Sequence, residues 1–162
     1  QKAYPQSTFV LDIVYYSTIQ VMLTGEVKSP GLYNLPSFAT VKDLLMVANG
    51  INANGSYRNI NVKRNSKVVE TFDAYNLISL GEYETPKLLQ NGDVETVSEA
   101  QKQIKLLGEV GNPALFELKN DESFASLFQF ASGFTYNANK NVIRLTRFVD
   151  NEKIKVYNNR RW

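Results

Sequence analysis

The sequence contains no cysteine and no histidine among its 162 residues. Without them there is no thiol nucleophile, no Ser-His-Asp relay, no histidine proton shuttle and none of the usual zinc or iron ligands. A metal would have to be held by carboxylates, as calcium and magnesium are. We therefore expect no cofactor and no transition-metal site, and the catalytic classes that need these side chains are excluded.

The chain also has no large excess of one charge over the other and no long apolar run. Lys and Arg number 18 against 16 Asp and Glu, which leaves a net charge of +2, whereas nucleic-acid-binding domains are usually strongly basic. The longest helical apolar run, Leu44 to Ala48, has five residues, far below the roughly 20 that cross a bilayer. We expect no nucleic-acid partner and no membrane insertion by these residues. With 43% hydrophobic residues, the chain can still bury a core.

What the chain does contain is an internal repeat at an offset of 83 residues. In this register Gly25-Glu26-Val27 aligns with Gly108-Glu109-Val110, and no gap is needed for forty positions. Pro30 then meets Pro113, and Gly50 meets Gly133. The period exceeds the roughly 20–50 residues of a solenoid repeat, so each copy should be a small domain with its own core.

The first copy has the pattern of a hairpin, a helix and three further strands. Ile19–Leu23 and Leu32–Leu35 flank a Pro-Gly turn, and Thr40 with Asp43 forms a capping box before a helix predicted over 40–49. Later strands are predicted at 60–63, 68–72 and 94–97. The order β-β-α-β-β-β indicates an α+β fold of the β-grasp type, a small mixed sheet around one main helix.

The second copy repeats this plan, with strands expected at 104–110, 114–118, 142–148 and 154–157 and a helix at 123–132. It lacks a counterpart of the closing segment 88–97, while Phe9–Val14 has strand character one repeat before 91–97. We expect a piece of a longer modular chain: 1-17 as the terminal strand of a preceding unit or a linker, 18-101 as the first domain, and 102-162 as a C-terminally truncated second domain. The residues expected to be buried are Leu44, Leu45, Ala48, Ile60 and Val62 in the first copy and Leu127, Phe128, Ala131, Ile143 and Leu145 in the second.

Three pieces of the first copy resemble the soluble-ligand-binding β-grasp (SLBB) domain. They are Val21-x-Leu23-x-Gly25-Glu26-Val27-x-x-Pro30-Gly31-x-Tyr33-x-Leu35, Thr40-Val41-x-Asp43-Leu44-Leu45-x-x-Ala48-x-Gly50, and Leu89-x-x-Gly92-Asp93-x-x-x-Val97. The pattern resembles most the tandem copies in Wza-type outer-membrane polysaccharide export proteins, over roughly residues 19 to 157. The second copy departs from it at Ala114, where glycine is usual.

The resemblance implies a periplasmic module of an outer-membrane-associated bacterial protein. The implied partners are a polysaccharide, further copies in a homo-oligomer of the full-length protein, and an inner-membrane polysaccharide co-polymerase. The export signature domain of that family would lie upstream of these residues, so another SLBB protein, such as a periplasmic capsule-assembly factor, stays open as the parent.

Basic residues follow the predicted helix in both copies, and a tyrosine lies near each group. A basic strip that recurs in two domains could meet an acidic polysaccharide, with an exposed ring stacking on a sugar face. The alternatives are a solvated strand face for the basic residues and ordinary packing for the rings. The candidate ligand-binding residues are Tyr57, Arg58, Arg64, Tyr136, Arg144 and Arg147.

Three classes of function remain open. The first is a non-enzymatic assembly module of an export protein, the second a stand-alone binder of a ligand or glycan, and the third an enzyme that uses a carboxylate pair on polysaccharide. Glu26 and Glu109 recur in both copies, which is more typical of structural residues at strand ends than of a catalytic pair at one site. Duplication favours the first two classes, in that order, because oligomer assembly and avidity both benefit from repeated surfaces.

Overall fold

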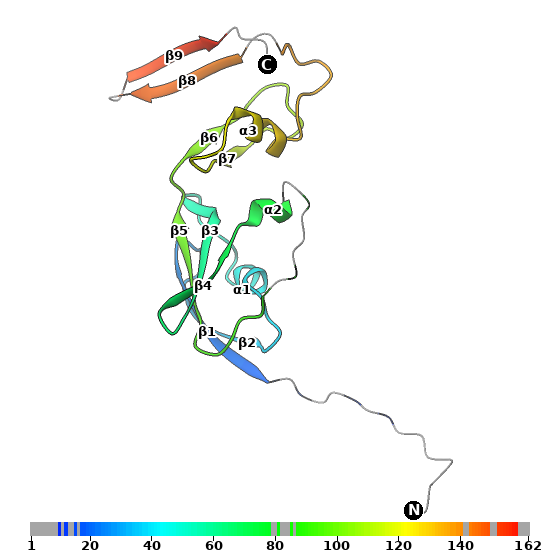
Figure 1. Cartoon of the computed structure of the whole chain (residues 1–162), viewed down its shortest axis with the longest axis vertical. Helices are drawn as coiled ribbons and strands as arrows, with labels where there is room; N and C mark the ends of the chain where they lie inside the picture. Colours follow the sequence, from blue (N-terminus) through cyan, green and yellow to red (C-terminus); the bar gives the residue numbers. More distant parts are fainter. Residues whose placement is uncertain are drawn as a thin grey trace, which may run out of the picture. The chain divides into compact units, whose positions relative to one another are not determined.

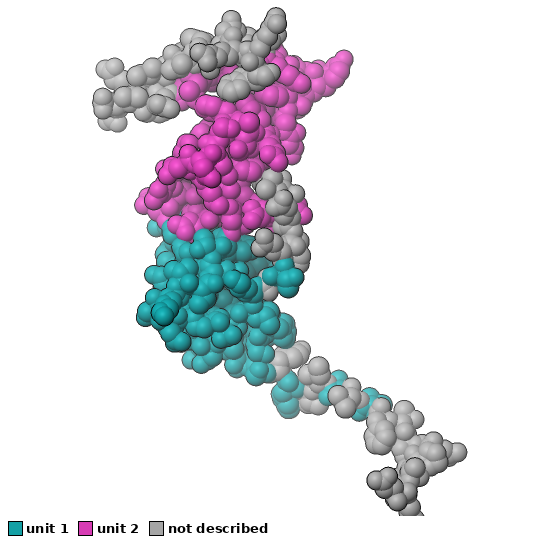
Figure 2. Space-filling model, viewed as in Figure 1, with its two compact units in different colours: residues 1–55, 60–72, 85–98 teal, residues 56–59, 73–84, 99–162 magenta. Residues whose placement is uncertain are grey.

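The structure is a computed structural model that describes residues 10, 12, 15, 17–78, 81, 85, 87–140, 143–149 and 152–158. The side chains of Ile78 and of residues beyond 146 lie outside this description. The chain divides into two compact units, coloured separately in Figure 2. Unit 1 comprises residues 1–55, 60–72 and 85–98, and unit 2 comprises 56–59, 73–84 and 99–162. No helix within the described ranges is long and apolar enough to cross a membrane.

Unit 1 is built on a five-stranded mixed sheet. Its strands are β1 (Thr18–Gly25), β2 (Gly31–Pro36), β3 (Gly55–Arg64), β4 (Lys67–Phe72) and β5 (Val94–Glu99), in the order β2-β1-β5-β3-β4 (Figure 1). β1 pairs antiparallel with β2 and parallel with β5, and β3 pairs antiparallel with β4. The last strand of the first copy, β5, is thus the central strand of the sheet, and the mixed sheet of five strands agrees with the predicted α+β fold.

Helix α1 (Val41–Val47) begins at the predicted capping box. The backbone N–H of Thr40 donates to Asp43 Oδ2 at 2.9 Å, and the Thr40 hydroxyl accepts from the backbone N–H of Asp43. Leu44 and Ala48 are fully buried in one cluster with strand residues that include Ile60 and Val62, and Leu45 packs partly buried against it. The predicted helix is confirmed, and so is the predicted burial of Leu44, Ala48, Ile60 and Val62, whereas Leu45 is only partly buried.

Unit 2 contains α2 (Ala74–Ile78), β6 (Gln103–Lys105), β7 (Leu115–Glu117), α3 (Phe124–Phe130), β8 (Ile143–Val149) and β9 (Glu152–Asn158). β6 pairs with β7 and β8 with β9, in two separate antiparallel ladders. In unit 1 the equivalents of β6 and β8, which are β1 and β3, are joined through β5. The strands described in unit 2 include no such central strand between β6 and β8, and they form two ladders.

The core of unit 2 follows the prediction in its helix and departs from it in its strands. Leu127 and Ala131 are buried, and Phe128 packs partly buried against their cluster, whereas Ile143 and Leu145 are only half-buried. Tyr75, from a segment that the sequence places in the first domain, completes this cluster. The predicted strand Phe9–Val14 falls on residues of which only Val10 and Asp12 are described.

Candidate functional site

Two basic residues of β3, Arg58 and Arg64, lie on the face of the strand that carries its apolar side chains. Ser56, Arg58, Ile60 and Val62 alternate as buried residues along β3, and Arg64 continues the same parity. Lys63 points to the opposite, exposed face. The expected basic strip is therefore not one exposed surface, because Arg58 and Arg64 share their face with the core.

Arg58 is a buried ion-paired residue of unit 2, with 5% of its side chain exposed. Its guanidinium pairs with Asp73 at 3.1 Å and with Glu122, and it lies 4.5 Å from the ring centre of Tyr75. Burial raises the pKa of Asp73, but hydrogen bonds from Arg58 and Lys119 outweigh this and hold it below its ordinary value. An incoming polymer would have to break these ion pairs to reach Arg58. The expectation that Arg58 forms part of an exposed basic strip is therefore wrong, because its side chain is buried.

Arg64, in unit 1, is held by a bidentate pair with Asp93. Arg64 Nε and Nη2 donate to the two carboxylate oxygens of Asp93, each at 2.8 Å. Asp93 is fully buried and also accepts from the backbone N–H of Gln90 at 2.8 Å. Burial raises the pKa of Asp93, and the hydrogen bonds from Arg64 more than offset this, so the pKa is lowered. The pair fixes both the guanidinium and the loop before β5, while 30% of the Arg64 side chain stays exposed.

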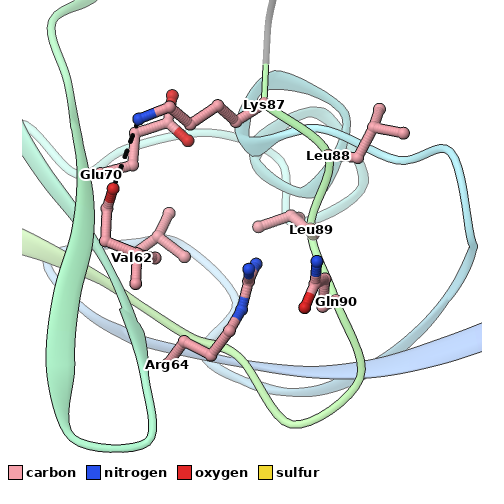
Figure 3. Close-up of a pocket in the computed structure, with 8 residues that line it drawn as sticks. Val62, Arg64, Glu70, Lys87, Leu88, Leu89 and Gln90 are labelled. Carbon is pink, nitrogen blue, oxygen red and sulfur yellow. Dashed lines mark hydrogen bonds between the residues drawn. The ribbon is translucent and has the colours of Figure 1, made fainter.

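A pocket of about 390 Å³ opens beside Arg64 (Figure 3). In Figure 3 the Arg64 guanidinium, the Leu89 side chain and the Gln90 amide converge, and Lys87 lies at the rim, where its ammonium donates to the Val69 carbonyl at 3.4 Å. Its size is at the lower end of the range for small-molecule sites. The lining residues, all of unit 1, are Val62, Arg64, Val69, Glu70, Lys87, Leu88, Leu89 and Gln90.

The other predicted site residues lie in unit 2. Tyr136 is fully exposed and Tyr57 is 42% exposed, and Arg144 is exposed as well. The side chain of Arg147 lies outside the described residues. Among the six predicted site residues, Arg64 is the one that lines the pocket. The sequence analysis missed the lining residues Lys87 and Gln90 because they are far from Arg64 along the chain.

Glu95 is a buried acid that the sequence analysis also missed. It is fully buried on β5, beside Leu23 of β1, and neither carboxylate oxygen accepts a hydrogen bond within the described part of the chain. Burial, with a smaller contribution from the charge of Glu70, raises its pKa from 4.5 to about 8. The alternation Val94-Glu95-Thr96-Val97 was the available signal, because it puts Glu95 on the same face as the buried Val97.

The two glutamates that recur in the repeat take part in local structure. The backbone of Glu26 donates to the Val97 carbonyl and accepts from the Asn52 N–H, each at 3.0 Å. Glu109 accepts from the Thr135 hydroxyl at 2.6 Å and, through its backbone carbonyl, from the Thr135 N–H. These contacts favour a structural role at the strand ends. Across the described residues no group of three acidic side chains is arranged to hold a metal ion.

Comparison with known proteins identifies both copies. The family model of the SLBB domain matches the chain twice, over residues 20–73 and 103–157, which is more than half of its length. The two matches begin at the same offset as the internal repeat. No curated protein matches the chain.

Proposed function

We propose that this chain, which belongs to the SLBB domain family, is a non-enzymatic periplasmic module of a capsular or exopolysaccharide export protein. In this role it contributes to assembly of the oligomer and contacts the polymer or the inner-membrane polysaccharide co-polymerase. The observation that carries the proposal is the tandem arrangement of two SLBB domains, at 20–73 and 103–157. Repeated surfaces suit both ring assembly and multivalent contact with a repeating polymer.

The absence of histidine and cysteine from the sequence and the structural contacts of Glu26 and Glu109 support a non-enzymatic role. Several common sets of acid-base and nucleophilic groups cannot be assembled without these side chains. Purified protein should therefore release no fragments from neutral or anionic polysaccharides. Turnover that disappears in Glu26→Gln or Glu109→Gln would assign a carboxylate mechanism and overturn this part of the proposal.

The second candidate is a stand-alone periplasmic protein that binds a ligand or glycan. The pocket at Arg64 favours it, because a small lined cavity can act without an oligomer. The two candidates differ in what the reading frame around these residues encodes and in what its loss causes. Only an export protein needs an upstream export domain and an outer-membrane anchor.

The test is an in-frame deletion of residues 20–157 from the full-length gene in the bacterium that carries it. We expect surface polysaccharide to fall and the protein's native oligomer, seen by native electrophoresis of membrane extracts, to be lost or reduced. The control is Lys67→Ala, an exposed change at the start of β4, which should leave both unchanged. Normal surface polysaccharide and a normal oligomer in the deletion strain would overturn the export proposal.

A further inference from the structure

The charges around the Arg64 pocket balance. Arg64 and Lys87 contribute two positive charges to its lining, and Glu70 contributes a negative one. Asp93, which pairs with Arg64, supplies the second negative charge. The buried carboxyl of Glu95 stays mostly protonated at neutral pH because its pKa is about 8. A ligand in this pocket therefore meets donors and acceptors without a net field that favours an anion.

The Arg64 guanidinium and the backbone of Gln90 are held in place before any ligand arrives. Asp93 holds two of the guanidinium nitrogens of Arg64 and also positions the backbone of Gln90. The hydrogen bonds of Arg64 to Asp93 use Nε and Nη2, and Figure 3 shows the Gln90 side chain near the Arg64 guanidinium. Preorganised donors of this kind cost little ordering entropy on binding.

Apolar side chains complete the lining. Val69 is 39% exposed in the lining. Leu89, which is 2% exposed, points toward the Arg64 guanidinium in Figure 3, whereas the Leu88 side chain points away from the other labelled side chains. A cavity with a few convergent polar groups and an apolar wall is typical of small-molecule sites. A sugar ring presents the matching pair of surfaces, since its hydroxyls lie around the edge and its C–H groups lie on the faces.

We propose that the pocket beside Arg64 binds a neutral saccharide unit, with its hydroxyls on Arg64, Lys87, Gln90 and Glu70 and its C–H face on Val69. The inference rests on the proposed function and names the site and the class of sugar. It differs from the basic-strip expectation in two measurable ways. The strip predicts preference for acidic polymer and a site in each copy, whereas the pocket predicts preference for neutral sugar and one site per chain.

The stoichiometry follows from the repeat. Arg64 has a counterpart in Arg147, but residues 87–90 have none, because an offset of 83 places it beyond residue 162. The loop that supplies Lys87, Leu88, Leu89 and Gln90 thus belongs to the first copy alone in these 162 residues. The pocket lies beside Arg64, so we expect one site per chain.

The experiment is a two-dimensional NMR titration of the ¹⁵N-labelled chain with neutral tetrasaccharides of glucose, galactose and mannose, and with tetragalacturonate as the acidic member of equal length. We expect at least one neutral member to bind at millimolar concentration, with shifts at Leu88, Leu89 and the Gln90 side-chain amide. Stoichiometry should be one per chain, and affinity should change little between low and high salt.

Gln90→Ala should weaken binding by about 2- to 10-fold, the loss of one or two neutral hydrogen bonds, and Lys87→Ala should do the same. Lys67→Ala, on the same sheet and outside the lining, should bind as the unchanged chain does. Three results would overturn the inference: failure of every neutral member to shift these signals, tighter binding of tetragalacturonate, or binding by Gln90→Ala and Lys87→Ala that is as tight as binding by the unchanged chain. If the deletion strain has lost surface polysaccharide, such a failure removes the pocket assignment only and leaves the export proposal standing.

Discussion

Glu95 provides a sharp test of how the core of unit 1 responds to pH. Its carboxyl is fully buried and both oxygens lack a hydrogen bond in the described part of the chain, and burial raises its pKa from 4.5 to about 8. The folded protein therefore keeps this proton over a range in which the unfolded chain releases it. Below 4.5 both states are protonated, and the group does not oppose folding. As the pH rises toward 8, unfolding becomes progressively more favourable.

The magnitude follows from linkage. Each pH unit in this window costs about 1.4 kcal/mol of the free energy of unfolding. The cost should reach about 3 kcal/mol at pH 7 and about 4 kcal/mol at pH 8, and it should level off at about 5 kcal/mol above pH 8. Since small domains are stable by only about 5–15 kcal/mol, this one group should dominate the loss of stability of unit 1 between pH 4.5 and about 8.

The perturbation is Glu95→Gln, which keeps the shape and removes the ionisation. At pH 4 the variant and the unchanged chain should have similar free energies of unfolding, because each buries a neutral polar group. At pH 7 the variant should be more stable by about 3 kcal/mol. The assay is urea unfolding at a series of pH values, followed by NMR signals of β1 and β5 amides, with Glu99→Gln, an exposed change at the end of the same strand, as control.

A direct measurement complements the unfolding series. The ¹³C carboxyl shift of Glu95 should titrate near pH 8, well apart from those of exposed glutamates. Titration near 4.5, or pH profiles of the two proteins that run parallel from pH 4 to 8, would refute the argument. Either result would mean that water or a rearranged partner reaches the carboxyl.

Three further predictions concern backbone fit, buried charge and the second core. Gly25 has φ +87°, and an added Cβ would lie 2.1 Å from the Val97 carbonyl oxygen, whereas Gly108 has φ +101° with open space around it; Gly25→Ala should cost well above the 1–2 kcal/mol of left-handed strain expected for Gly108→Ala, as measured by urea unfolding. Equal losses would show that the contact with β5 is relieved. Arg58→Met should cost about 3–5 kcal/mol, because Asp73 and Glu122 lose their buried partner, and a change below 1 kcal/mol in thermal or urea unfolding would contradict the burial of this cluster. A fragment of residues 99–162 should show weaker amide dispersion in NMR spectra than a fragment of 55–162, since it lacks Tyr75, whose ring packs edge-on against Phe130 at 5.1 Å; equal dispersion would show that this core forms without it.

Local signals made the first copy predictable. The capping box of Thr40 and Asp43 places both partners within three residues, and the hairpin of β1 and β2 joins strands that are adjacent in sequence. The repeat then transferred the helix to the second copy, where Ser123 caps α3 by accepting from the Ala125 N–H at 3.2 Å. Each of these features depends on contacts between near neighbours in the chain.

The candidate site was less predictable because its contacts are distant in sequence. Arg58 meets Asp73 and Glu122 across 15 and 64 residues, and Arg64 meets Asp93 across 29. No local sequence pattern predicts which residues form ion pairs over such separations. One available signal was misread: the alternation that buries Ile60 and Val62 also directs Arg58 and Arg64 to the buried face, so a group of basic residues that are close in sequence is not one surface.

The two copies also show that a matched sequence does not imply a matched environment. In the first copy, the segment that leads into and forms β5 covers Gly25 with the Val97 carbonyl and gives Arg64 its acid in Asp93. It also gives the pocket Lys87, Leu88, Leu89 and Gln90. The second copy keeps the glycine at Gly108 without any such contact. The contacts of β5 and the loop before it thus distinguish the five-stranded sheet with its pocket from the two ladders of unit 2. For this reason, the number of ligands bound per chain should follow the number of such loops and not the number of repeats.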